Sequence, residues 1–148
     1  MMKRYLSLDV GDRTIGIAVS DLLGLTAQGV ETIRRTNLEA DLKRLGELMD
    51  QYETRSLVSG LPRNMDGTEG DRCEIVRAFA DEVKKAYPDV TITFWDERLS
   101  TVAATRSLLE ADLSRRKRKK VIDKMAAVFI LQGFLDHQRI AAARADQN

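Results

Sequence analysis

The chain has 148 residues and a net charge of +1, with 43% hydrophobic and 32% charged residues, which excludes a disordered, fibrous or polycationic protein. It has neither a signal-peptide pattern at its start nor an apolar run near the roughly 20 residues of a membrane span, so we expect one cytoplasmic domain over residues 1–148. One cysteine and one histidine exclude an internal disulfide and the common zinc sites, so oxygen atoms must bind any metal.

Three strands are predicted at the start of the chain. The first lies within Arg4–Gly11, where polar and apolar residues alternate until Asp9 ends the strand beside a glycine. A carboxylate in that place is either a site residue or an ordinary turn former, and this stretch alone does not decide between them. The segments Thr14–Ser20 and Thr26–Arg34 follow as the second and third strands and predict an antiparallel meander.

Helices and strands alternate after the meander. A helix capped by Asn37 has its apolar stripe within Leu38–Met49 and precedes a fourth strand at Arg55–Gly60. A second helix, which Pro88 ends, precedes a fifth strand at Thr91–Glu97. This order predicts an α/β fold with a five-stranded mixed sheet, in which a three-strand antiparallel meander and two parallel strands have helices on both faces.

The last third of the chain is predicted to be helical around a basic segment. Ser100 caps a third helix over Thr101–Ala111, and a block of basic residues follows. The last helix is expected from Val121 to about His137 and is apolar almost all round, which indicates that it is buried. Residues from about 139 to 148 are expected to form a flexible C-terminal tail.

Three acids that are distant in the sequence are candidates for one catalytic metal site. Asp9 and Glu97 end strands that, if parallel, reach the same edge of the sheet, where α/β proteins usually bind ligands. Asp123 begins the inward-facing stripe of the last helix, and the small Ala126 and Ala127 would let that helix pack close to the sheet. Such a cluster would need divalent cations such as Mg²⁺ or Mn²⁺, which would position a water for phosphodiester hydrolysis.

Each acid also has an ordinary structural explanation. Glu97 would form a surface ion pair with Arg98 or Arg13, and Asp123 would simply favour a helix N-terminus. Asp96 competes with Glu97, because adjacent strand residues face opposite ways and only one of the two can point into the cluster. The residues alone leave these alternatives open.

Basic residues supply the second part of a nucleic-acid site. Six of them stand directly before the helix of Asp123: Arg115, Arg116, Lys117, Arg118, Lys119 and Lys120. Such a block binds phosphate backbones, unless it is only a solvated loop. Further phosphate contacts are expected from single arginines elsewhere in the chain, namely Arg13, Arg63, Arg72 and Arg98.

Four segments, in order, resemble the signature of the YqgF/RuvX family and span nearly the whole chain. They are Leu8–Gly11 with Thr14–Asp21, Gly60–Thr68, Asp96–Thr101 and Asp123–Ala127. The resemblance implies a ribonuclease H-like fold related to the RuvC resolvase, with the three acids as catalytic and metal-binding residues. It also implies maturation of the 5′ end of pre-16S rRNA on ribosomal precursor particles in the bacterial cytoplasm.

The leading hypothesis is therefore a metal-dependent nuclease acting on RNA, as a monomer or a homodimer. A resolvase acting on structured DNA is an alternative, although this chain has Ala126 and Ala127 where the resolvase-type site has a fourth acid. A non-catalytic RNA-binding assembly factor is another. An actin-like ATPase or sugar kinase, which the first strand and Gly16 also resemble, needs two domains, for which 148 residues are too few.

Overall fold

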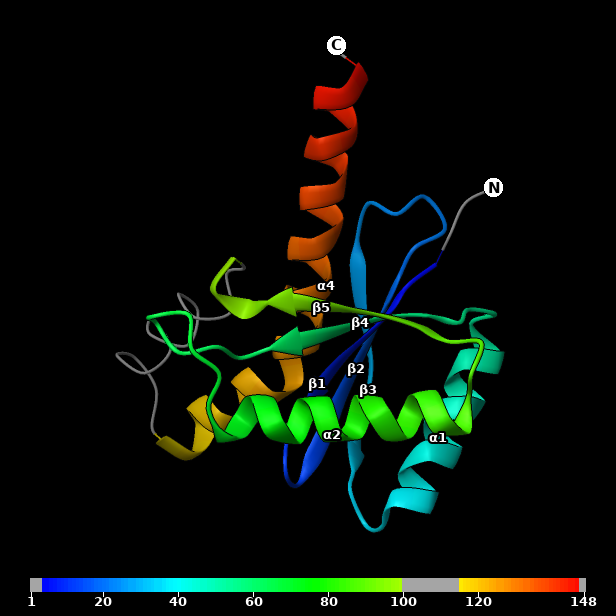
Figure 1. The fold of residues 1–148 in the computed structure, drawn as a ribbon, viewed down its shortest axis with the longest axis vertical. Helices are drawn as coiled ribbons and strands as arrows, with labels where there is room; N and C mark the ends of the chain where they lie inside the picture. The colour runs from blue at the N-terminus through cyan, green and yellow to red at the C-terminus, as the bar shows by residue number, and fades with distance from the viewer. Residues whose placement is uncertain (1–3, 100–114, 147–148) are drawn as a thin grey trace.

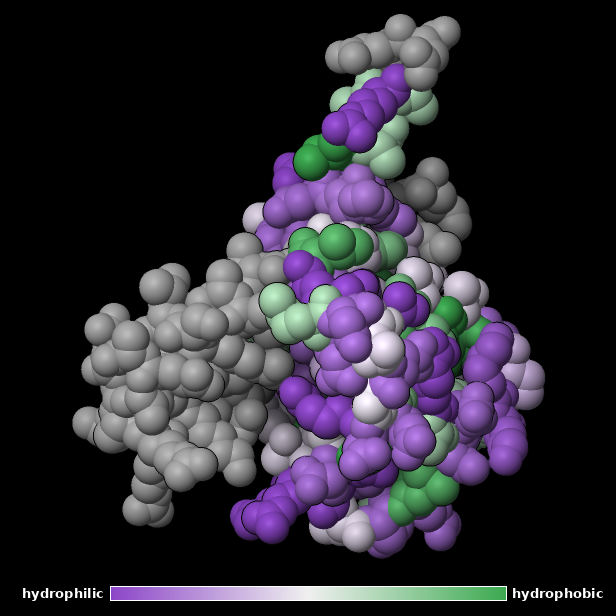
Figure 2. All heavy atoms as spheres, turned by 60° about the vertical axis from the view of Figure 1, so that its left-hand side comes forward, coloured by the Kyte–Doolittle hydropathy of each residue, from purple (hydrophilic) through white to green (hydrophobic). Residues whose placement is uncertain are grey.

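The computed structural model describes residues 4–99 and 115–146, with residues 115–124 and 146 described by their backbone alone. The expected third helix over Thr101–Ala111, with its cap at Ser100, lies outside the described residues. Within the described part, no helix is long and apolar enough to span a membrane. On the face that Figure 2 shows, hydrophilic side chains predominate and the exposed apolar ones are scattered.

Five strands form one mixed sheet in the order β3-β2-β1-β4-β5. The first three strands pair antiparallel, whereas β4 is parallel to both β1 and β5. This pairing confirms the predicted meander followed by two parallel strands. Antiparallel neighbours need only a short connection, whereas parallel neighbours need a crossover, which the helices supply. The strands are β1 (Leu6–Val10), β2 (Thr14–Ser20), β3 (Ala27–Arg34), β4 (Ser56–Leu61) and β5 (Thr91–Asp96).

Helices cover both faces of the sheet, as predicted (Figure 1). Helices α1 (Leu38–Gln51) and α2 (Asp71–Ala86) pack on one face, and α4 (Arg115–Asp146) crosses the other. Asn37 caps α1 as expected, since its side-chain oxygen accepts a hydrogen bond from the backbone N–H of Ala40 at 2.9 Å. A short 3₁₀ turn, η1 (Glu97–Leu99), follows β5 directly.

Helix α4 is longer than the sequence indicates at both ends. It begins at Arg115 instead of Val121 and continues to Asp146, through the residues that were expected to form a tail. Arginine, lysine and alanine are strong helix formers, so the basic block and the Ala-rich end extend the helix although neither carries an apolar stripe. The basic block is therefore part of a helix, and the alternative of a solvated loop is wrong.

Each face of the sheet has its own apolar cluster. The cluster under α1 and α2 is built from large aliphatic side chains, including Leu6, Leu48 and Met49. The cluster under α4 is smaller and contains Trp95 and Ile130 together with alanines. The site described below lies at one end of this second face.

Candidate active site

The carboxyl ends of three neighbouring strands reach the same edge of the sheet. In the parallel pair of β1 and β4, Leu8 lies opposite Ser59, which brings Asp9 level with Gly60 one residue further along. Gly60 is in turn paired with Trp95 on β5. Asp9 therefore ends its strand beside the last residues of β4 and β5, as the sequence predicts.

These strand ends share the face that α4 covers. Ser7 lies on this face, because its hydroxyl donates a hydrogen bond to the backbone carbonyl of Ala127 at 2.7 Å. Side chains alternate along a strand, so Asp9, two residues later, points to the same side. Trp95 packs into the same cluster as Ala127 and Ile130. Asp9 is thus directed toward the α4 side of the sheet.

Glu97 is buried on this same face, with only 6% of its surface exposed. Its Oε1 lies 2.9 Å from the point where a Cβ atom on Gly60 would be, and Cδ1 of Ile130 lies 2.5 Å from that point. A side chain at this position would force the ends of both neighbouring side chains to shift, and glycine avoids this. The carboxylate of Glu97 therefore lies over Gly60, on the strand next to that of Asp9.

Asp96 has a different environment. It is bonded to the guanidinium of Arg98, with a shortest contact of 2.6 Å, and the same arginine reaches the carbonyl of Met65 at 3.4 Å. The hydrogen bond from Arg98 lowers the pKa of Asp96 below its usual value. Asp96 thus joins η1 to the loop after β4, while Glu97 occupies the face of Asp9. Arg98, which the sequence suggested as a partner of Glu97, binds Asp96.

The turn that follows Asp9 is braced by a half-buried arginine that the sequence reasoning did not identify. The Arg35 guanidinium donates to the Gly11 carbonyl at 2.8 Å and to the Asp41 carboxylate at 3.2 Å, and lies 5.1 Å from the ring centre of Phe79. Gly11 itself bonds across the turn to the carbonyl of Thr14 at 2.8 Å. One side chain therefore ties the end of β1 to both α1 and α2. The available signal was the Arg34-Arg35 pair at the end of a strand, where alternation sends one of the two inward.

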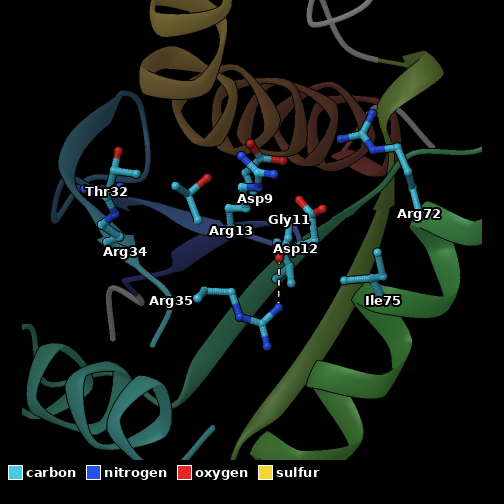
Figure 3. A pocket seen from close by; sticks show the side chains of 11 residues that line it. Asp9, Gly11, Asp12, Arg13, Thr32, Arg34, Arg35, Arg72 and Ile75 are labelled. Carbon is cyan, nitrogen blue, oxygen red and sulfur yellow. Dashed lines mark hydrogen bonds between the residues drawn. The ribbon is translucent and has the colours of Figure 1, made fainter. Parts of the chain in front are cut away.

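A pocket of about 780 Å³ opens around Asp9 and this turn (Figure 3). Its walls come from β1, the β1–β2 turn, the end of β3 and the first turns of α2. Four arginines and two aspartates are among its residues, so the lining is strongly polar. The lining residues are Asp9, Val10, Gly11, Asp12, Arg13, Thr14, Thr32, Arg34, Arg35, Arg72 and Ile75.

The expected phosphate-binding residues separate into three groups. Arg13 and Arg72 line the pocket. Arg63 lies 3.8 Å from a carboxylate oxygen of Glu69 and Arg98 is bound to Asp96, so both are engaged within the protein. The third group, Arg115, Arg116, Lys117, Arg118, Lys119 and Lys120, lies in the first turns of α4, where the backbone alone is described.

The donor atoms of this face fit a hard divalent cation in part. Asp9 and Glu97 both supply carboxylate oxygens, and Gly60 leaves the room that the second carboxylate occupies. Asp123 lies in α4, but its side chain is outside the described residues. Among the side chains that are described, no three acids, histidines or cysteines form a metal cluster.

Comparison with known sequences identifies close relatives. The model of the family RuvX, described as Holliday junction resolvase, matches residues 3–137. A relative from Clostridium botulinum (strain Hall) is 58% identical over 133 residues, covering 90% of this chain and 96% of that protein. A relative from Heliobacterium modesticaldum is 55% identical over 141 residues, covering 95% and 94%. Both carry the name "Putative pre-16S rRNA nuclease".

Solved structures agree on the fold. The structure of Thermus thermophilus RuvC superposes with a TM-score of 0.59 at 8% identity, covering 93% of this chain and 96% of that chain. The same protein in complex with a Holliday junction substrate gives a TM-score of 0.56 at 12% identity, covering 92% and 96%. At such low identity these structures support the shared architecture alone.

Proposed function

Because this chain belongs to the RuvX family, we propose that it is a nuclease that hydrolyses RNA phosphodiester bonds in the maturation of the 5′ end of pre-16S rRNA. The named relatives match more than nine tenths of their own length, so the likeness extends over the whole catalytic domain. On this proposal its partners are precursor rRNA and ribosomal precursor particles in the cytoplasm.

The observation that carries the proposal is the position of Glu97. The Glu97 side chain has 6% exposure and lies over Gly60. Gly60 belongs to β4, the strand next to that of Asp9, and Asp9 points to the same face of the sheet. Carboxylate oxygens are the ligands that hard divalent cations prefer, so two carboxylates on one face at neighbouring strand ends favour a metal site there. The rest of the proposed site is arranged around this pair.

We assign Asp9, Glu97 and Asp123 as ligands of Mg²⁺ or Mn²⁺. Asp123 is supported by its spacing in α4, since it precedes the buried Ala127 by four residues and such positions share one face of a helix. When bound, divalent cations at such a site lower the pKa of a water and stabilise the charge on the phosphate. Residues Arg115–Lys120, three to eight residues before Asp123, would hold the polyanionic strand, which the acids alone would repel.

Each described acid has a distinct task in this proposal. Asp9 lies near the end of an interior strand that has a neighbouring strand on each side, so its side chain extends from a rigid backbone. Glu97 is fixed by burial against Ile130 and Gly60, which restricts its rotamers and keeps water away from one side of the site. Together they orient the reacting phosphate relative to the nucleophilic water.

A Holliday-junction resolvase is the second candidate, favoured by the description of the matching family. Ala126 and Ala127 weigh against it, because each is 1% exposed and packed at the place where the resolvase-type site has its fourth acid. A DNA four-way junction therefore belongs in the same assay as the RNA.

The test compares cleavage of a 5′-extended 16S precursor RNA with cleavage of a DNA four-way junction, in Mg²⁺ or Mn²⁺. We expect RNA cleavage, reduced by about a thousand-fold in Asp9→Asn and in Glu97→Gln, because metal-borne charge stabilisation is worth several kcal/mol. Asp81→Asn, the same chemical change at an exposed position of α2, serves as the control and should cleave like the unmodified protein.

Three results would reject the proposal. Equal cleavage by Asp9→Asn would assign the activity to a contaminant. Cleavage of the junction alone would make the protein a resolvase. RNA binding without any cleavage would identify a non-catalytic assembly factor.

A further inference from the structure

The arginines of this protein differ sharply in whether a carboxylate binds them. Most of those whose side chains are described form ion pairs, including Arg44 with Glu31 and Arg77 with Glu69. Three others line the pocket beside Asp9, and no ion pair or hydrogen bond holds their guanidinium groups within the described residues. These three are Arg13, Arg34 and Arg72.

The three arginines come from three separate elements. Arg13 is in the β1–β2 turn, Arg34 ends β3 opposite Thr14, and Arg72 is in the first turn of α2. Figure 3 shows Arg34 and Arg72 on opposite sides of the pocket with Asp12 between them. Segments far apart in the sequence therefore direct unpaired cations into one concave surface.

The other charged residues of the pocket do not cancel the positive charge of these three arginines. Arg35 is already bound to Asp41 and to the Gly11 carbonyl, so it braces the wall and adds no unpaired cation. Asp12 is exposed, so solvent screens its charge, and Asp9 is assigned above to the metal site. An unpaired guanidinium favours a planar anion that it can bind through two parallel hydrogen bonds, and phosphate has that geometry.

We propose that this pocket binds backbone phosphates of the nucleic-acid strand on one side of the bond that is cut. The inference rests on the nuclease function proposed above and adds phosphate contacts to those proposed for the basic start of α4. A volume of about 780 Å³ is of the size that holds whole small molecules, so one or more nucleotides fit. Phosphate contacts fix the register of a strand, so the pocket sets which bond faces Asp9.

The experiment measures binding without cleavage. A fluorescent single-stranded RNA is titrated in EDTA with the unmodified protein and with the double variant Arg34→Gln/Arg72→Gln, at several salt concentrations. Loss of two phosphate contacts should weaken binding about ten-fold or more and reduce the slope of log K against log salt by about 1.4.

A matched double variant controls for total charge. Arg44→Gln/Arg77→Gln removes the same two charges from α1 and α2, including one from the helix of Arg72, but these arginines are bound to carboxylates and lie outside the pocket. It should bind RNA nearly as tightly as the unmodified protein. Thermal unfolding of both variants verifies that they are folded.

The outcomes separate this inference from the proposed function. Equal loss in both double variants, or no loss in Arg34→Gln/Arg72→Gln, would overturn the pocket while leaving nuclease activity intact. If the protein binds RNA through these arginines but never cleaves it, the nuclease function is rejected and phosphate binding in the pocket is supported. Tight binding of a free mononucleotide, lost in the same variant, would make this a small-molecule site and reject the strand.

Discussion

The two faces of the sheet differ in what they bury. Under α1 and α2 the packing consists of large aliphatic side chains such as Leu48 and Met49, at 0% and 1% exposure. Under α4 the buried residues include the polar Ser7 and Glu97 and the small Ala127. Burial of large apolar side chains stabilises a fold, whereas small side chains bury less apolar surface. The comparison indicates that one face supplies most of the stability and the other keeps room for chemistry.

The largest expected effect on stability comes from the first face. Leu48→Ala removes a fully buried side chain from the cluster under α1, and should lower the free energy of unfolding by about 2–5 kcal/mol. Urea unfolding measures this loss, with Leu22→Ala, at 59% exposure, as the control. Cleavage per folded molecule should be unchanged at low temperature. If folded Leu48→Ala no longer cleaves, the assignment of stability to one face and of catalysis to the other is contradicted.

A smaller effect is expected on the α4 face, where Gly60→Ala tests the space above β4. The new Cβ would lie 2.9 Å from Glu97 Oε1 and 2.5 Å from Ile130 Cδ1, so both must shift. We expect a loss of about 1–3 kcal/mol in stability together with a marked loss of cleavage. Gly29→Ala is the matched control, since its nearest contact is Val128 at an ordinary 3.6 Å. Normal cleavage by Gly60→Ala would show that the position of Glu97 is not critical.

The smallest expected effect concerns an ion pair at the margin of the first face. The hydrogen bonds from Arg44 hold the pKa of Glu31 below its usual 4.5. This pair stabilises the fold above pH 4.5 and loses its effect as pH falls through the lowered pKa, because the carboxyl then takes up a proton. The Tm difference between the unmodified protein and Glu31→Gln should therefore shrink on acidification. A difference that stays constant down to pH 3 would contradict it.

Sequence patterns were sufficient for the order of the strands and for Asp9. The alternation from Leu6 to Val10 identifies a strand that ends on an acid, and the helices between the later strands require parallel pairing. The choice between Asp96 and Glu97 could not be made, because η1 interrupts the alternation directly after β5. It depends on Gly60 and Arg98, which are brought to these acids only by folding.

The pairing of the arginines was also beyond sequence reasoning. Arg63, Arg72 and Arg98 were all expected to contact phosphate. In the described part of the chain, Arg63 and Arg98 meet a carboxylate and Arg72 does not. Whether a guanidinium finds a partner depends on which elements pack beside it. Arg34 and Arg35 show the same limit. They are adjacent in the sequence and nothing along the chain distinguishes them, yet Arg35 is the one that binds Asp41.

The central place of β1 in the sheet determines which parts of the molecule can adapt to different RNAs. Its backbone is bonded to β2 on one side and to β4 on the other, so opening it would break two ladders at once. The pocket arginines, by contrast, extend from a turn, a strand end and the start of a helix. Bends and bulges in a precursor would be accommodated by rotation of these long side chains, while the acid at the end of β1 keeps its place.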